Sequence, residues 1–276
     1  MRLSGKVVIV TGSAAGIGRA IAIRCVAEGA RVVVHGLEAD LVAEVVAGLV
    51  AGVVAGSGRG NAVGHVEDVT TDGCPERLVS LAIASFGRLD GVVNNAAVIT
   101  TGDIHSTDAA SFNRTLAVNT LAPLRLIQAA LPHLAATRGS VLNIGSVNAY
   151  SGEPKLLPYS ISKGGLMTLT RNLGDVLFRE EGIRVNQINP GWVLTENEIL
   201  RKRSHGLADD WPAYRPREFC PAGRLIRPEE IAAAAVFWLA DECGPMSGQV
   251  VDLEQHPFIG RNPPKTIATV PPPPAS

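Results

Sequence analysis

Short runs of apolar residues alternate along the chain with longer segments in which apolar residues recur at helical spacing. Runs such as Val7–Val10 are apolar at every position, which is typical of a parallel strand buried on both faces. The predicted strands are Val7–Val10, Val32–Val34, Asn61–Val66, Gly91–Val93, Ser140–Ile144, Val185–Ile188 and Gln249–Leu253. Helical spacing covers residues 17–27, 108–135, 158–179 and 228–240. This alternation predicts an α/β fold with a doubly wound parallel sheet in three α/β/α layers.

Three regions depart from this pattern. Residues 48–64 are rich in Gly, Ala and Val, and their GSGRGN stretch predicts a loop. Residues 195–222 hold charges, aromatics and three prolines without a clear period. The tail 256–276 ends in a run of prolines that can neither pair in a sheet nor continue a helix, so we expect an extended arm. No boundary divides residues 1–255, which we interpret as a single domain.

Composition narrows the classes of partner and site. The 276 residues are 46% hydrophobic and carry a net charge of -1, so no basic excess favours nucleic acid or an anionic membrane. The four cysteines lie far apart in no metal-ligand spacing, so no metal site is predicted and a reducing compartment is favoured. The apolar run near the N-terminus is too short for a signal peptide or a membrane span. We therefore expect the protein in the cytoplasm.

A glycine loop joins the first predicted strand to the first predicted helix. In Thr11–Gly18 we expect Gly12 to allow a sharp turn, Gly16 to leave room for a pyrophosphate and Gly18 to allow close packing. The N-terminus of the following helix would offer free N–H groups and a positive dipole to phosphate. Three glycines alone are weak evidence, but their place between a buried strand and a helix favours a dinucleotide site.

Tyr159 and Lys163 lie four residues apart and would share one face of a helix. A free phenol has a pKa of about 10, and a neighbouring ammonium favours its ionised form. Such a pair is common on surface helices and carries no chemistry by itself. Ser146 follows a predicted strand at its carboxyl end, where open parallel sheets bind ligands, and its hydroxyl can hydrogen-bond a reacting oxygen.

These motifs together resemble the short-chain dehydrogenase/reductase family in its compact single-domain form, which has a Rossmann fold. The matching motifs are TGxxxGIG at 11–18, Asp68-Val69, Asn94-Asn95-Ala96-Ala97, Asn119, Ser146, Tyr159-x-x-x-Lys163, and Pro190-Gly191 with Thr195. The resemblance covers about residues 4–254 and is specific because the motifs occur in order. It implies an NAD(P)-dependent oxidoreductase that interconverts a secondary alcohol and a ketone by hydride transfer.

The resemblance also implies the role of each site residue. Tyr159 would be the general acid and base, Lys163 would lower its pKa, Ser146 would orient the substrate and Asn119 would hold a water in a proton relay. Asp68 would accept from the adenine amino group, and Asn95 and Ala96 would present backbone to the ribose. The cofactor positions are Gly12, Ser13, Gly16, Ile17, Gly18, His35, Asp68, Val69, Asn95, Ala96, Tyr159, Lys163, Pro190, Gly191, Val193 and Thr195.

The position that selects the nucleotide departs from the family pattern. Gly36 stands where a carboxylate favours NAD, and Leu37 where an arginine often favours NADP. His35 and Arg19 are the nearest candidate donors to a 2′-phosphate. Because nothing visible excludes that phosphate, we expect NAD(P) with a slight lean to NADP.

Substrate and assembly are less determined. The segment 195–222 lies where this family places a substrate lid, with Arg201-Lys202-Arg203 as candidate anion ligands or a solvated basic stretch. Trp211, Tyr214 and Phe219 would wall an apolar pocket or pack the lid. Sugars, polyols, hydroxy acids and 3-oxoacyl compounds all remain open. Relatives commonly pair through the two long helices and the last strand, so a dimer or a homotetramer is expected, although Leu253 and Glu254 replace the usual glycines there.

Three alternatives compete with this hypothesis. A catalytically silent nicotinamide-binding sensor should have a damaged Tyr/Lys/Ser set, which is intact here. A dehydratase or epimerase would usually need a longer chain with a separate substrate domain. A serine hydrolase would need a GxSxG elbow, which is absent around Ser146.

Overall fold

Seven parallel strands form one sheet in the computed structural model, which describes residues 1–51, 61–150, 152–204, 206–208, 210–214, 217 and 220–257. The strands are β1 (Val7–Val10), β2 (Arg31–Gly36), β3 (Ala62–Val66), β4 (Gly91–Asn94), β5 (Ser140–Ile144), β6 (Arg184–Pro190) and β7 (Val250–Leu253). Their order is β3-β2-β1-β4-β5-β6-β7, and every neighbouring pair is parallel. The strand order reverses between β1 and β4, the point at which such sheets bind ligands.

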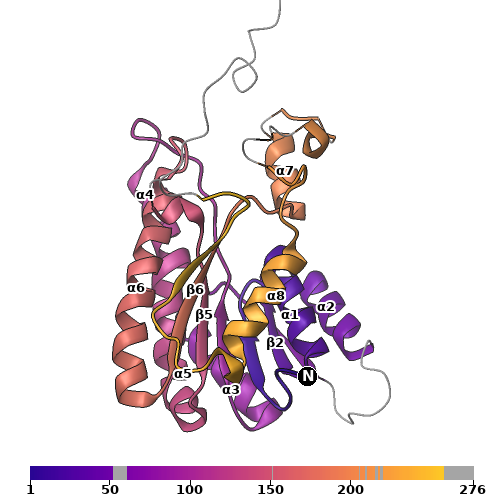
Figure 1. The fold of residues 1–276 in the computed structure, drawn as a ribbon, viewed down its shortest axis with the longest axis vertical. Helices are drawn as coiled ribbons and strands as arrows, with labels where there is room; N and C mark the ends of the chain where they lie inside the picture. The colour runs from indigo at the N-terminus through magenta and orange to yellow at the C-terminus, as the bar shows by residue number, and fades with distance from the viewer. Residues whose placement is uncertain are drawn as a thin grey trace, which may run out of the picture.

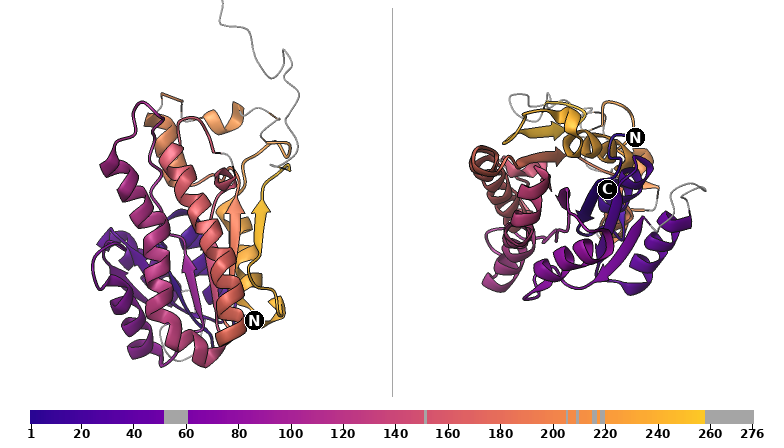
Figure 2. Two further views of the ribbon diagram at one scale, coloured as in Figure 1. Left: turned by 90° about the vertical axis from the view of Figure 1, so that its left-hand side faces the viewer. Right: turned by 90° about the horizontal axis from the view of Figure 1, so that it is seen from below.

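Helices cover both faces of the sheet (Figures 1 and 2). One face packs against α1 (Gly16–Ala27), α2 (Ala39–Ala51) and α8 (Pro228–Leu239), and the other against α3 (Cys74–Phe86), α5 (Ala122–Thr137) and α6 (Leu157–Glu181). Each face has its own apolar core, because a strand directs alternate side chains to opposite faces. The predicted three-layer α/β fold with a doubly wound parallel sheet is confirmed.

Two of these helices were not predicted from the sequence. Residues 48–51, the start of the segment that departs from the regular pattern, form the last turn of α2, whose Val42, Val45 and Leu49 are buried against the sheet. The GSGRGN stretch predicted as a loop lies outside the described residues except for Asn61. Helix α3 is likewise held by buried Leu78 and Ala82. Burial of one helical face outweighs the modest helix propensity of valine and glycine.

The long helix predicted over 108–135 is interrupted. Helix α4 (Ala109–Leu116) leads into a π-helical segment, Ala117–Leu121, before α5 begins. Pro123 explains the interruption, because it has no N–H to donate to the carbonyl of Asn119 four residues earlier.

The segment predicted as a lid contains α7 (Glu196–Ser204), which lies beyond the carboxyl ends of the strands (Figure 1). A small apolar cluster beneath it joins Trp211, Cys220 and Leu225 with Trp192 and Leu194. The side chain of Tyr214, Phe219 and the tail from residue 258 lie outside the described residues. In the described part of the chain, no helix has the length and apolar character needed to cross a membrane.

Candidate active site

The carboxyl ends of the strands bring the predicted site residues to one edge of the sheet. The loop 11–18 follows β1, Asp68 and Val69 follow β3, Asn95 and Ala96 follow β4, Ser146 follows β5, and Gly191, Val193 and Thr195 follow β6. Since every strand is parallel, loops from distant parts of the sequence meet there. The same edge carries Tyr159 and Lys163 on α6.

The glycine loop fits a dinucleotide phosphate. Gly12 and Gly16 have φ of 61° and 54°, a left-handed conformation that favours glycine. A Cβ on Gly18 would clash with the carbonyl oxygen of Gly12 and with the amide of Asn95, so this glycine lets α1 begin close to the segments that follow β1 and β4. Helix α1 starts after Ala15 with no side-chain cap and no acidic residue in its first turn. Its N-terminal N–H groups, Ile17 among them, are therefore suited to an anion.

Ser13 and His35 lie beneath this loop and support it from inside the protein. The Ser13 hydroxyl donates to the carbonyl of Val10 (2.7 Å) and accepts from the N–H of His35 (3.0 Å). His35 Nδ1 accepts from the Gly12 N–H (3.2 Å), and His35 Nε2 donates to the carbonyl of Glu67 (2.9 Å). Burial lowers the pKa of His35 to about 4, so the ring is neutral at pH 7. Both ring nitrogens are used within the protein, which leaves no donor for a phosphate.

The nucleotide-selecting position after β2 is closely packed. A Cβ on Gly36 would lie 2.8 Å from the Ala14 Cβ and 3.0 Å from Val42 Cγ2. Leu37 is 58% exposed beside it. Arg19, the second candidate donor, is paired with Glu196 of α7.

Asp68 is held by neighbours on both sides. Its carboxylate accepts from the N–H (2.9 Å) and hydroxyl (2.7 Å) of Thr70 and from the guanidinium of Arg114 on α4. Burial alone would raise the pKa of Asp68, but Arg114 and Thr70 together lower it to about 2. The carboxylate is therefore ionised and fixed where the sequence predicts an adenine contact, while Val69 stands half-buried beside it.

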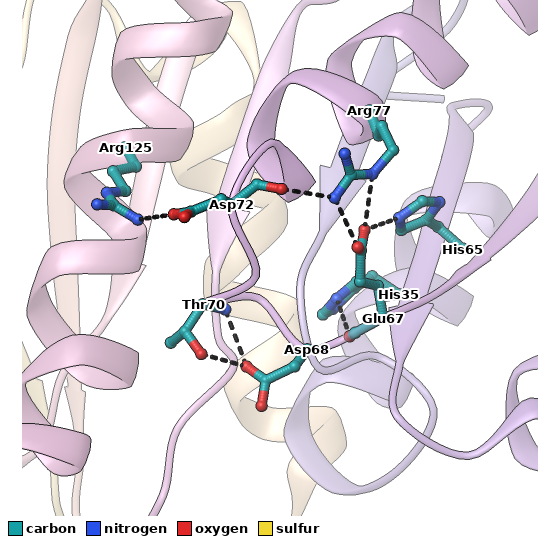
Figure 3. A network of polar contacts seen from close by, with 8 residues as sticks. All are labelled: His35, His65, Glu67, Asp68, Thr70, Asp72, Arg77 and Arg125. Atoms are coloured by element: carbon teal, nitrogen blue, oxygen red, sulfur yellow. Dashed lines mark hydrogen bonds and ion pairs between the residues drawn. The ribbon is translucent and has the colours of Figure 1, made fainter.

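A polar cluster lies next to Asp68 (Figure 3). His65 and Arg77 both donate to the carboxylate of Glu67, and they lower its pKa to about 2. His65, Glu67 and Cys74 place potential metal ligands within 4.8 Å of one another. Arg77 already neutralises Glu67, and burial raises the pKa of Cys74 to about 12, so this cluster is satisfied as a hydrogen-bonded network.

Asn95 and Ala96 are joined to the strand that carries the glycine loop. Their N–H groups both donate to the hydroxyl of Thr11, at 3.0 and 3.1 Å. The Asn95 amide donates to the carbonyls of Thr11 and Gly12, each at 2.9 Å. Asn95 thus shapes the cradle through its side chain, a role that the sequence analysis did not assign.

Tyr159, Lys163 and Ser146 are all buried at the centre of this edge. Lys163 Nζ donates to the carbonyl of Ile144 (2.7 Å) and lies 5.7 Å from the centre of the Tyr159 ring. Burial lowers the pKa of Lys163 to about 8. Burial also raises the pKa of Tyr159, against the opposing effects of the Ser146 hydroxyl and the Arg201 guanidinium. This desolvation cannot be seen in residue spacing, and it acts against the lowering of the Tyr159 pKa by Lys163 that the resemblance implies.

Asn119 lies in the π-helical segment with its side chain fully bonded. The amide accepts from the N–H of Val98 and donates to the Val98 carbonyl and to the Ser162 hydroxyl, each at 2.9 Å. Ser162 in turn donates to the carbonyl of Tyr159 (2.6 Å). Asn119 therefore ties the π segment to α6 beside the reactive pair.

The segment after β6, residues 191–195, contacts the end of β7 and the start of α1 at this edge of the sheet. The Gly191 N–H donates to the carbonyl of Leu253 (2.9 Å), and a Cβ on Gly191 would clash with the carboxylate of Glu254. Val193 is buried and pairs with Ile226, and Thr195 lies against Gly16 at the start of α1. Glu254, one of the two departures from the usual glycines, thus packs directly against the Pro190-Gly191 turn.

Glu198 of α7 is a residue that the sequence analysis missed. It is buried and accepts from the indole N–H of Trp192 (2.8 Å) and from Arg201 (2.6 and 2.9 Å), with Lys202 Nζ at 3.8 Å. Trp192 stacks on Trp211 with ring centres 5.4 Å apart. The only signal in the sequence was its spacing, since Glu198 lies three residues before Arg201 and four before Lys202.

Comparisons with known proteins agree with this arrangement. Residues 12–254 match a protein-family model described as enoyl-(acyl carrier protein) reductase. The chain is 32% identical to an uncharacterized oxidoreductase of Thermotoga maritima, over 92% of this chain and 98% of that protein. It is 33% identical to 2-(S)-hydroxypropyl-CoM dehydrogenase 3 of Xanthobacter autotrophicus (90% and 94%) and 36% identical to L-fucose dehydrogenase of Mus musculus (87% and 84%). All three similar proteins are named as oxidoreductases or dehydrogenases.

Proposed function

Since this chain belongs to the short-chain dehydrogenase/reductase family and is an NAD(P)-dependent oxidoreductase acting on CH–OH donors, we propose that it interconverts a secondary alcohol and a ketone with Tyr159 as general acid and base. The observation that carries the proposal is the burial of Tyr159 and Lys163 beside Ser146, at the edge that also holds the glycine loop.

Each residue of the site has a distinct task in this mechanism. The nicotinamide, when bound, supplies the hydride exchange. Tyr159 takes the hydroxyl proton during alcohol oxidation and returns it during ketone reduction, while the Ser146 hydroxyl hydrogen-bonds the substrate oxygen. Lys163 stabilises the phenolate by its charge, and its buried ammonium is fixed by the carbonyl of Ile144.

Asn119 completes the proton path in this proposal. Its main-chain carbonyl lacks the usual partner, because Pro123 cannot donate to it. We propose that this carbonyl binds the water that connects Lys163 to solvent, while the Asn119 side chain fixes the π segment to Val98 and Ser162.

The proposed cofactor is NAD(P), with at most a slight preference for NADP. His35 and Arg19, the donors on which that preference rested, are engaged with Glu67 and Glu196, and Gly36 supplies no carboxylate to select NAD. We therefore expect kcat/KM values for NAD and NADP to agree within about tenfold, or about 1.4 kcal/mol. A preference far above tenfold for either nucleotide would contradict this.

The proposed substrate is a small secondary alcohol. The names of the similar proteins include a sugar dehydrogenase and a hydroxypropyl-CoM dehydrogenase, and the stacked Trp192 and Trp211 support an apolar wall beneath the lid. We also propose that the chain assembles as a dimer or tetramer.

The test is a panel of secondary alcohols and ketones, assayed by the absorbance of the reduced nicotinamide. Turnover is expected for wild type, and Tyr159→Phe should fold and bind cofactor while kcat falls by about 10²–10⁴-fold. Melting temperature and cofactor fluorescence separate loss of chemistry from loss of fold. Cofactor binding without turnover on any substrate would favour a silent sensor, and near-normal kcat in Tyr159→Phe would remove the assignment.

A further inference from the structure

A chain of side-chain hydrogen bonds crosses the sheet beneath Ser146, from β4 to β7. The donors and acceptors in order are Asn94 Nδ2 to Asn143 Oδ1 (2.8 Å), Asn143 Nδ2 to Thr170 Oγ1 (2.8 Å), Thr170 Oγ1 to Gln187 Oε1 (2.8 Å), Gln187 Nε2 to Asn189 Oδ1 (2.7 Å) and Asn189 Nδ2 to Asp252 Oδ1 (3.0 Å). All members before Asp252 are buried. The Thr170 hydroxyl also lies 2.9 Å from the carbonyl of Leu166, a second acceptor for its single hydrogen. When that hydrogen is directed to Gln187, whose carbonyl oxygen needs a donor, every link donates in the same direction.

Asp252 sets the direction of the chain at its last link. A carboxylate only accepts, so Asn189 must turn its NH₂ group toward Asp252. Its carbonyl oxygen then faces the opposite way, where it accepts from the main-chain N–H of Ser146 (3.1 Å) and from Gln187. The phenol of Tyr150 also donates to Asp252 Oδ1 (3.0 Å).

The backbone at Gly145, just before Ser146, packs tightly against these amides. A Cβ on Gly145 would clash with the side chains of Asn189 and Gln187, so these two amides lie in direct contact with the main chain there. The Gly145 N–H is itself bonded to the carbonyl of Ile188 (2.7 Å). Rotation of the Asn189 amide would place its NH₂ group against the Ser146 N–H, two donors facing each other.

We propose that Asn189, oriented by Asp252, is a positioning residue that fixes Ser146 for the reaction. Ser146 has an extended backbone, and its hydroxyl accepts from the Asn148 N–H (3.2 Å). Loss of the Asn189 acceptor frees the Ser146 N–H, and the hydroxyl no longer meets the substrate oxygen at the right place. The inference rests on the proposed role of Ser146 and concerns kcat rather than cofactor binding.

Substitutions at Asp252 test the proposal with least disturbance, because this residue is only half-buried. Asp252→Ala removes the acceptor and should lower kcat by about tenfold or more, since small misplacements of a reacting group are costly. Asp252→Asn retains an acceptor oxygen and should restore most of that loss. Cofactor Kd should stay within about twofold in both variants. Equal kcat in wild type and Asp252→Ala would overturn the proposal.

Asn189→Ala tests the contact itself, with Asn186→Ala as the matched control. Asn186 lies on the same strand, is equally buried and makes two hydrogen bonds of 2.9 Å, to the Met246 carbonyl and from the Gln249 N–H. Both variants should lower the melting temperature, but only Asn189→Ala should lower kcat per folded enzyme. Equal kcat in the two variants would contradict the proposal. A normal kcat in Ser146→Ala would instead overturn the proposed function.

Discussion

At the scale of single residues, the imidazole of His35 connects two parts of the cofactor cradle. One ring nitrogen accepts from Gly12 in the glycine loop, and the other donates to the carbonyl of Glu67, next to Asp68. This arrangement requires the neutral ring with its proton on Nε2, since protonation of Nδ1 would turn the Gly12 contact into two opposed donors. The protonation state of one side chain is thus linked to the shape of the loop.

This linkage predicts a loss of stability in mild acid. The pKa of His35 is lowered from 6.5 to about 4 by burial, so the unfolded chain binds the proton first as pH falls. The contribution of neutral His35 to the free energy of unfolding is fully retained above pH 6.5. It is lost as pH falls toward 4, and the loss is about 3 kcal/mol at most. Urea unfolding at pH 7 and 4.5 should show a smaller pH effect in His35→Gln than in wild type. His105→Gln, at an exposed position, is the control and should behave as wild type.

Arg201 provides a second prediction at this scale. Its guanidinium lowers the pKa of Tyr159, and Glu198, which Arg201 neutralises, raises it. Arg201→Gln should therefore raise the pKa of Tyr159 and move the acidic limb of the pH profile for alcohol oxidation to higher pH. Arg179→Gln, at the far end of the same helix as Tyr159, should leave the profile in place. A limb that stays fixed in Arg201→Gln would show that Arg201 does not act on Tyr159.

At the scale of elements, the strands and the edge that carries the site were predictable because their signals are local. A buried parallel strand is apolar throughout, and the loops after parallel strands must meet at one edge. Gly12 and Ser146 follow β1 and β5 and lie at that edge for this reason. Helix α2 was missed because its valines are average helix formers and are held by the sheet, which only the folded chain reveals.

The site contacts that could not be predicted are those made across the fold. His35 was expected to donate to a phosphate, but its partners lie 23 and 32 residues away. Asp68 meets Arg114 from α4, 46 residues distant. No spacing rule connects such positions, because the pairs arise only from the packing of separate elements.

The π-helical segment yields a prediction for an element. Pro123→Ala would supply an N–H to the Asn119 carbonyl and favour a continuous α-helix, which withdraws that carbonyl from the proposed proton path. We expect kcat to fall by about tenfold, the size of a partial loss of proton transfer. Pro132→Ala, inside α5 but away from Asn119, should leave kcat unchanged. An unaltered kcat in Pro123→Ala would show that the π segment has no role in proton transfer.

At the scale of the whole molecule, one helix layer is associated with the glycine loop and the other with the reactive residues. Helices α1, α2 and α8 form the layer that starts at the glycine loop, whereas α3, α5 and α6 form the other layer. On that side the π segment carries Asn119, and α6 carries Tyr159 and Lys163. The outer surface of the second layer exposes apolar side chains, Leu121 at 43% and Val176 at 37%. This layer carries the reactive residues on its inner side. A second copy of the chain that packs on its outer side would therefore hold them in position.

Charged substitutions on this outer face test the proposed assembly. Leu121→Glu combined with Val176→Glu should shift the chain to a smaller species in light scattering, because two buried carboxylates without partners oppose association. Ile104→Glu, at a position 78% exposed in a loop, supplies the same change of side chain away from this face and should keep the assembly of wild type. If the double variant and Ile104→Glu both retain the wild-type mass, the outer face that carries Leu121 and Val176 does not form the contact between copies. A smaller species with reduced kcat but normal melting temperature would further indicate that assembly holds α6, and with it Tyr159 and Lys163, in place.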